Sequence, residues 1–291
     1  MFYLLTVVLA WGLTWPVNKV LLHSLSPLWL LSLRSAIAAV ALFAIAAALG
    51  RLARPPRTDV PVVLSITLLH MVGFGVLTAW GLQLIPAGRS VVLAYTTPLW
   101  VAPGAALFLH ERLGARGLAG VVLGLLGLAV LFNPVGFDWT DRRSALGHGA
   151  ILLGAALWAA SIVHIRGHRW QSAPFDLAPW QMLLATVLVT PLALLVDGPP
   201  AAVWRARELA LLLYAGIPGT AVAYWATAMA SRALPAVTTS LGLLATPVLS
   251  VTVATLWLGE PVTPSLVAAI VLILGGVAIG TTGERARTPA G

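Results

Sequence analysis

The chain has 291 residues, of which 59% are hydrophobic and 9% charged, and its mean hydropathy is +0.96. This composition is far more apolar than a soluble domain of that length needs for one core, so water is excluded as its main solvent. The net charge of +8 is dispersed among short loops, which indicates anchoring to anionic lipid and not a nucleic-acid surface. The absence of cysteine excludes disulfides, thiol catalysis and Cys-based metal sites.

Ten runs of about 20 mainly apolar residues predict membrane-spanning helices, because that length crosses roughly 30 Å of hydrocarbon and satisfies the backbone internally. The first run has no basic segment before it and no small-residue cleavage site, so we expect a spanning helix there and not a secretory signal. The fold class is therefore all-α integral membrane. In chain order the expected spans are 2–22, 28–49, 60–84, 87–109, 114–132, 145–165, 177–196, 208–231, 235–258 and 263–282.

The two halves of the chain repeat one another. Three residues in the first half recur 149 positions later in the second, as Pro86 and Pro235, Pro98 and Pro247, and Glu111 and Glu260. Upstream the spacing is 147, which relates Trp11 to Trp158, Thr14 to Ser161, Lys19 to Arg166 and Pro27 to Pro174. The pattern indicates a tandem duplication with repeats at 1–132 and 145–283, a connecting loop at 133–144 and a tail at 284–291.

Each repeat holds five expected helices, and an odd number inverts the second copy in the membrane. The sequence therefore predicts ten transmembrane helices as two inverted five-helix repeats, an arrangement of secondary transporters that place the solute site between the repeats. With both termini in the cytoplasm, ten Lys and Arg residues fall in inside loops and six in outside loops, which favours cytoplasmic termini and a cytoplasmic tail.

Two segments carry a resemblance to a known family. Ala-Tyr-Thr-Thr-Pro-Leu-Trp at 94–100, followed by Phe-Leu-His-Glu-Arg-Leu, is echoed by Leu-Ala-Thr-Pro-Val-Leu at 244–249, followed by Trp-Leu-Gly-Glu-Pro-Val. These segments resemble the signature of EamA-type carriers of the drug/metabolite transporter superfamily, and the resemblance covers nearly the whole chain. Trp-Gly-x-Thr at 11–14 and Arg34, with Gln181 at the equivalent position, also fit. The resemblance implies the ten-helix fold and transport, and it is closest to bacterial inner-membrane exporters of amino acids, including aromatic ones.

Two prolines and a set of aromatic residues are the candidate site residues. Pro98 and Pro247 are expected near the centres of their helices, where they either shape packing or act as hinges beside a cavity. Trp11, Trp100 and Trp158 lie too deep for the interfacial belt, so each packs between helices or forms the wall of a solute cavity. The same wall is expected to include Tyr95, Tyr224 and Trp225.

The charged residues restrict the mechanism. All nine acidic residues are expected in loops or at helix ends, so no carboxylate is available at membrane depth for a proton relay. His70 is the histidine nearest the middle of a span. It either satisfies an interhelical hydrogen bond or faces the cavity and binds the carboxylate of the solute. We expect Arg34 to be a structural, snorkelling residue, and we expect no cofactor and no metal site.

Glycines mark the last helix of each repeat. Gly117, Gly120, Gly124 and Gly127 in one, and Gly275, Gly276 and Gly280 in the other, predict that these helices pack against each other or against a second protomer.

The function expected from these features is a secondary transporter of the bacterial inner membrane that exports amino acids or related small metabolites by alternating access. A multidrug or other metabolite exporter on the same fold is the alternative. A membrane-embedded enzyme is a remote alternative, because no catalytic set such as paired Asp residues is expected at membrane depth. The expected partners are a small-molecule solute and the lipid bilayer, without nucleic acid. The solute, the direction of transport, the coupling ion and the choice between monomer and homodimer stay open.

Overall fold

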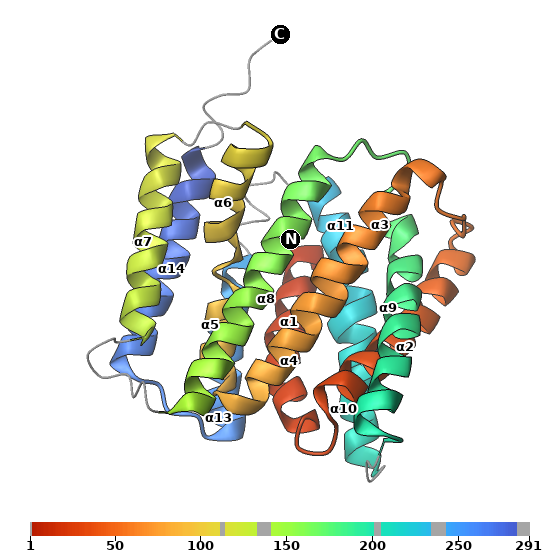
Figure 1. Ribbon diagram of the computed structural model, residues 1–291, viewed down its shortest axis with the longest axis horizontal. Coiled ribbons are helices and arrows are strands. Elements are labelled where there is room, and N and C mark those ends of the chain that lie inside the picture. The colour runs from red at the N-terminus through yellow and green to blue at the C-terminus, as the bar shows by residue number, and fades with distance from the viewer. Residues whose placement is uncertain (1, 111–113, 133–140, 201–204, 234–242, 284–291) are drawn as a thin grey trace.

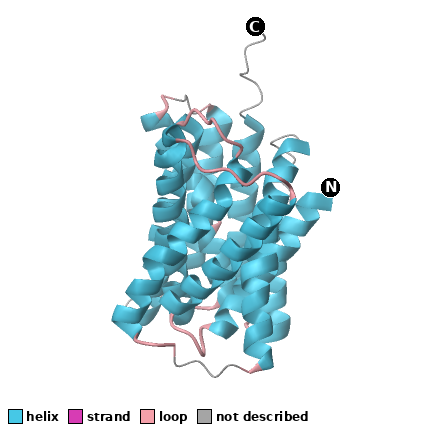
Figure 2. Cartoon of the chain, turned by 90° about the vertical axis from the view of Figure 1, so that its right-hand side faces the viewer, coloured by secondary structure: helices cyan, strands magenta, loops and turns pink. Residues whose placement is uncertain are grey.

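The computed structural model describes residues 2–110, 114–132, 141–200, 205–233 and 243–283, and none of these residues lies in a strand (Figure 2). The helices run roughly side by side, with loops at the two ends of the molecule. Seven stretches are long and apolar enough to cross a membrane, and three shorter apolar helices, Ala115–Leu131, Ala245–Leu258 and Pro264–Gly280, follow the same pattern. The chain is an all-helical membrane protein. Each of the ten expected spans overlaps one of these stretches or helices, while the count of ten membrane crossings stays a prediction.

The helices of the first half are α1 (Phe2–Leu21), α2 (Pro27–Ala48), α3 (Val60–Ser65), α4 (Gly75–Leu84), α5 (Ala87–Ala94), α6 (Thr97–Phe108) and α7 (Ala115–Phe132). A short 3₁₀ turn, η1 (Arg57–Asp59), precedes α3, and a π-helical stretch, η2 (Ile66–Phe74), joins α3 to α4. The helices of the second half are α8 (Arg142–Gly167), α9 (Pro174–Asp197), α10 (Ala206–Gly216), α11 (Ala223–Ala233), α13 (Ala245–Leu258) and α14 (Pro264–Gly283). A second π-helical stretch, η3 (Ile217–Val222), joins α10 to α11.

The segment expected as one kinked helix at 87–109 is two helices. α5 ends at Ala94, α6 begins at Thr97, and Pro98 lies in the first turn of α6, where the missing amide hydrogen costs no hydrogen bond. The carbonyls near the break are not left free, because the Thr96 and Thr97 hydroxyls donate to Leu93 O at 2.6 Å and Ala94 O at 2.7 Å. The interruption precedes Pro98 by two to three residues, Pro98 lies at the middle of the apolar stretch Ala87–Phe108, and its role as a kink or hinge stays a prediction.

The second half shows the same interruption. Leu244 follows Tyr95 by 149 residues and breaks the helix just before α13, so that Pro247 also lies in a first helical turn. Residues 234–242 lie outside the described part of the chain, so the expected position of Pro247 near the centre of the span 235–258 stays a prediction. The π-helical stretches are repeated in the same way, because η3 follows the middle of η2 by the same spacing. Both halves therefore carry a helix break and a π-helical stretch at equivalent positions.

The glycine-rich helices pack against each other at one edge of the molecule, as the sequence predicts (Figure 1). A Cβ atom on Gly276 would lie 2.6 Å from Gly120 O, so the backbones of α7 and α14 touch there. Gly127 lies against Ile273 while Gly120 lies against Gly276 and Gly280, so the two helices run antiparallel.

At the opposite edge α2 and α9 also run antiparallel (Figure 1). Ser26, which caps the start of α2, donates to Asp197 at the end of α9 over 2.5 Å. Just beyond the end of α2, Arg51 forms a 2.8 Å ion pair with Asp176 near the start of α9. Three clusters of buried apolar side chains, which include Leu30, Met182 and Leu93, fill the space between the helices.

The turn between α4 and α5 is held by two charged residues from elsewhere in the chain. Lys19 of α1 donates to Leu82 O at 2.5 Å and Ile85 O at 2.8 Å, which are carbonyls at the carboxyl end of α4. The Glu260 carboxylate accepts from the amides of Ala87 at 2.6 Å and Gly88 at 2.8 Å, at the amino end of α5. Each charge thus meets the helix end of opposite partial charge.

The first helix of the second half begins earlier than expected. Asp141 caps α8 by accepting from the amides of Arg143 and Ser144, so the helix starts at Arg142 and not at 145. Glu111, residues 133–140 and the tail 284–291, which the sequence analysis also assigned, lie outside the described residues.

Candidate substrate cavity

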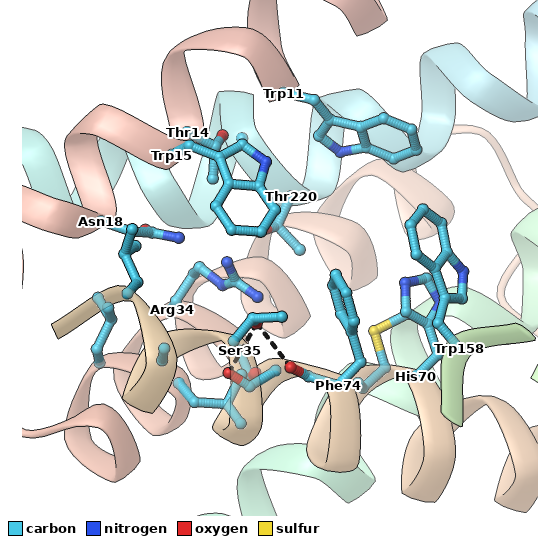
Figure 3. A pocket seen from close by; sticks show the side chains of 18 of the residues that line it. Trp11, Thr14, Trp15, Asn18, Arg34, Ser35, His70, Phe74, Trp158 and Thr220 are labelled. Carbon is cyan, nitrogen blue, oxygen red and sulfur yellow. Dashed lines mark hydrogen bonds between the residues drawn. The ribbon is translucent and has the colours of Figure 1, made fainter. Parts of the chain in front are cut away.

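A cavity of about 110 Å³ lies between helices from both halves of the chain (Figure 3). Its wall combines side chains of α1, α2, η2 and α4 with side chains of α8, α9, η3 and α11. The lining residues are Trp11, Thr14, Trp15, Asn18, Leu30, Leu31, Arg34, Ser35, His70, Met71, Phe74, Gly75, Thr78, Ala79, Leu82, Tyr95, Trp158, Met182, Gly219, Thr220 and Tyr224.

One side of the cavity is a cluster of aromatic rings. His70 stacks on Trp158 with ring centroids 4.8 Å apart and an interplanar angle of 13°, and Phe74 packs against the same indole at 5.0 Å. Within the described part of the chain the ring nitrogens of His70 have no hydrogen-bond partner. His70 thus lines the cavity, as one of its two expected positions has it, and stacks there on Trp158.

Trp11 and Tyr224 close another part of the wall. Their rings meet edge to face with centroids 6.3 Å apart, and the Tyr224 hydroxyl donates to Met71 Sδ over 3.1 Å. Tyr95 lines the cavity from the break between α5 and α6. Five of the seven expected cavity residues, Trp11, His70, Tyr95, Trp158 and Tyr224, thus share one cavity.

The other two expected cavity residues do not line it. The Trp100 ring is 38% exposed, and its Nε1 donates to Thr96 Oγ1 over 3.3 Å on its own helix. Trp225 packs on the cluster of buried side chains that includes Met182, and it meets Tyr3 edge to face at 5.5 Å. Neither Pro98 nor Pro247 lines the cavity, although Pro98 directly follows the break at Tyr95.

The sequence analysis expected Trp11 in the cavity wall but missed Thr14, Trp15 and Asn18, which line the cavity from the same face of α1. Trp11, Thr14, Trp15 and Asn18 all line the cavity, and their spacing of three, one and three places them on one helix face. This spacing is readable in the sequence, because Thr14 and Asn18 lie on the same helix face as two tryptophans in a mainly apolar helix. The Oδ1 atom of Asn18 is buried and has no hydrogen-bond partner among the described residues.

Arg34 of α2 also lines the cavity, where the sequence analysis expected a snorkelling residue. In Figure 3 its guanidinium lies between Asn18 on one side and Phe74 on the other. Its Nε is buried, and no residue in the described part of the chain accepts a hydrogen bond from it. The cavity therefore has an aromatic side around Trp158 and a polar, cationic side around Arg34.

No acidic side chain of the described residues lines the cavity. The described acids lie at or near helix ends, as the sequence predicts, and most have partners there. Asp59, for example, accepts from His168 at 3.0 Å and from the amides of Gln171 and Ser172. In the same part of the chain no three His, Asp or Glu side chains gather as a metal site would require.

Comparison with known proteins agrees with a transport role. The EamA-like transporter family matches residues 1–133 and 145–282. A probable amino-acid metabolite efflux pump of Salmonella typhimurium is 30% identical over 305 residues, which cover 99% of this chain and 97% of that protein. A probable terminal-alkyne amino-acid exporter of Streptantibioticus cattleyicolor is 28% identical over 284 residues, covering 96% of this chain and 90% of the exporter.

An uncharacterized transporter of Bacillus subtilis is 25% identical over 278 residues, 96% of this chain and 95% of its own length. A solved crystal structure shares the fold with a TM-score of 0.69 and 23% identity, over 98% of this chain and 97% of the other. With a family match that spans both halves, relatives that align from end to end and a cavity enclosed by membrane helices, the chain belongs to the EamA-like transporter family.

Proposed function

We propose that the protein is a secondary transporter that exports amino acids or related small metabolites across the bacterial inner membrane by alternating access. The observation that carries this proposal is the position of the cavity, which both halves of the chain enclose. Trp11 and Arg34 come from the first half, and Trp158 and Tyr224 from the second. A solute held there contacts both halves, so a rocking of one half against the other would move access from one side of the membrane to the other.

The two halves are proposed to be inverted repeats, 1–132 and 145–283, joined by the loop 133–144. Equivalent helices of inverted repeats run in opposite directions, and two such pairs support the proposal. α7 and α14 are antiparallel at one edge of the molecule, and α2 and α9 are antiparallel at the other. With five membrane crossings in each repeat and the basic residues concentrated in the inside loops, both termini and the tail 284–291 are cytoplasmic.

The size of the cavity and the printed names of two relatives support an amino acid as the solute. Those relatives are an amino-acid metabolite efflux pump and a terminal-alkyne amino-acid exporter, both designated probable. A cavity of about 110 Å³ is well below the 300 to 1,000 Å³ of sites for drug-sized ligands. An amino acid with a small or medium apolar side chain fits these limits better than a drug.

The test is counterflow with the purified protein in liposomes. Vesicles loaded with one unlabelled amino acid are expected to accumulate the labelled form transiently, while protein-free vesicles do not. A panel of all common amino acids identifies the solute. If none exchanges while a drug-sized compound does, a multidrug exporter replaces the amino-acid exporter. If no small molecule exchanges in either panel, the transport proposal itself fails.

A further inference from the structure

Arg34 places a permanent positive charge in the cavity wall. It lies seven residues into α2, which begins at Pro27, and so about 10 Å along the helix axis from its start. Of the residues that line the cavity, Arg34 is the single Lys or Arg within the described part of the chain. Its counterpart in the second half, Gln181, is neutral, 3% exposed and absent from the wall. The cationic side therefore breaks the symmetry of the duplication.

The Arg34 guanidinium has no acidic partner among the described residues. Its Nε is buried without a hydrogen bond, and the ion pairs of the described acids go to Arg51 and His168. The other acids of that part of the chain lie at helix ends, as Asp197 does beside Ser26 and Glu260 at the start of α5. None of the described residues in the wall supplies a negative charge.

The charge of Arg34 cannot be removed by deprotonation, because a guanidinium stays protonated in proteins. An unpaired charge in a low-dielectric interior is strongly unfavourable unless an anion or several hydrogen-bond acceptors meet it. The planar fork of an arginine matches a carboxylate with two parallel hydrogen bonds. A solute carboxylate would therefore pair with the Arg34 guanidinium, which no acidic side chain of the described residues does.

The same cavity offers a second polar atom without a partner. The side-chain oxygen of Asn18 is buried and accepts no hydrogen bond, and it lies on the α1 face that lines the cavity. An ammonium group is a donor without acceptor capacity and so complements this oxygen. A guanidinium and an amide oxygen in one small cavity fit the two charged groups of an amino acid.

We infer that Arg34 binds the carboxylate of the transported solute and that Asn18 accepts a hydrogen bond from its ammonium. The apolar side chain then faces the aromatic rings around Trp158. This inference rests on the proposed function and deepens it, because it makes the carboxylate a condition of recognition. A compound of the same shape without that charge should bind more weakly.

The experiment compares leucine with leucinamide, which replaces the carboxylate by a neutral amide and keeps the ammonium and the side chain. Both compete for counterflow of labelled leucine in phosphatidylcholine liposomes, which carry no net anionic headgroup that would compete for the guanidinium. In the parent protein leucine is expected to compete about tenfold or more better than leucinamide, given the strength of charged hydrogen bonds. Arg34→Gln is expected to lose this preference, and Arg34→Lys to keep part of it, since the charge remains without the fork.

A binding measurement keeps the test valid if Arg34→Gln does not fold. Leucine is expected to raise the unfolding temperature of the purified parent protein, and leucinamide is not. Equal competition or equal stabilisation by the two compounds overturns the role of Arg34, and so does a preference that survives in Arg34→Gln. Isocaproate, which lacks the ammonium, tests Asn18. Asn18→Leu should weaken competition by leucine and leave isocaproate unchanged, and an equal loss for both compounds overturns the role of Asn18.

The two proposals fail in different ways. If the protein exchanges another amino acid but not leucine, the comparison is made between that amino acid and its amide. If an amino acid and its amide exchange equally, transport stands and the carboxylate assignment is wrong. If nothing exchanges and neither leucine nor leucinamide stabilises the protein, both proposals fail.

Discussion

His70 lies flat on Trp158, with an interplanar angle of 13° and 4.8 Å between the ring centroids. The imidazole belongs to the π-helical stretch η2 and the indole to α8, so this stack joins the first half of the chain to the second across the cavity wall. π-Helical stretches are rare and are found frequently at functional sites. Here the stretch carries His70, Met71 and Phe74 of the cavity wall.

Removal of the indole from this stack is expected to impair transport. Trp158→Ala removes the ring on which both His70 and Phe74 pack, and an aromatic pair contributes about 0.5 to 1.5 kcal/mol beyond its buried area. The initial rate of amino-acid counterflow should fall several-fold. Trp100→Ala is the matched control, because that ring lies outside the cavity and should leave the rate unchanged. Equal rates for both variants would mean that the aromatic side of the cavity does not contact the solute.

Transport is expected to need no proton gradient. No carboxylate of the described residues lines the cavity, and His70 is the lining residue whose unperturbed pKa, about 6.5, is near working pH. Counterflow should therefore proceed at the same pH on both sides of the membrane, and His70→Gln should not abolish it. The contrary result is uphill accumulation that requires a pH difference and disappears in His70→Gln. That result would make His70 the coupling residue.

The inverted repeat predicts opposite sides of the membrane for two exposed loop residues. Leu52, between α2 and η1, should face the cytoplasm, and Pro261, between α13 and α14, should face the periplasm. Because the chain has no cysteine, Leu52→Cys and Pro261→Cys each introduce a single thiol. An impermeant maleimide added to intact cells should label the cysteine at 261 and should label the one at 52 only after lysis. Labelling of both in intact cells would contradict the topology.

Two neighbouring glycines on α14 should respond differently to the same substitution. A Cβ on Gly276 would lie 2.6 Å from Gly120 O and 2.9 Å from Gly124 N, whereas a Cβ on Gly275 would meet nothing within 4 Å. Gly276→Ala is expected to force α7 and α14 apart and lower the unfolding temperature in detergent. Gly275→Ala should be neutral or stabilising by up to about 1 kcal/mol, as alanine favours a helix over glycine. Similar melting of both variants would show that the two helices do not touch there.

Much of the fold was predictable because hydrocarbon thickness imposes the length of an apolar run. The span expected at 28–49 is α2 at Pro27–Ala48, a shift of one residue. The break at Tyr95 was not predictable, because a proline at position 98 is compatible with both a kink and a helix start. The outcome depends on local partners such as the Thr96 hydroxyl, which satisfies Leu93 O.

The cavity was predictable in part for a different reason. Lipid is as apolar as a protein core, so a membrane helix need not show which of its faces is buried. Depth in the membrane could therefore be inferred for Trp100 and Trp158 alike, but not that only Trp158 faces the cavity. The polar stripe of α1 is the exception, because Thr14 and Asn18 mark its inner face among apolar residues.

The turn between α4 and α5 has a consequence for how its sequence can diverge. Lys19 and Glu260 bind backbone carbonyls and amides there, which every residue except proline provides in the same form. The side chains at Leu82, Ile85 and Ala87 can therefore drift without loss of these bonds, within the limits of their packing. Lys19 and Glu260, by contrast, must each keep their charge, and exchanging the two residues would not preserve their favourable contacts with the helix ends. A lysine at 260 would place a positive charge at the partially positive amino end of α5. A glutamate at 19 would place a negative charge at the partially negative carboxyl end of α4, so both contacts would be repulsive.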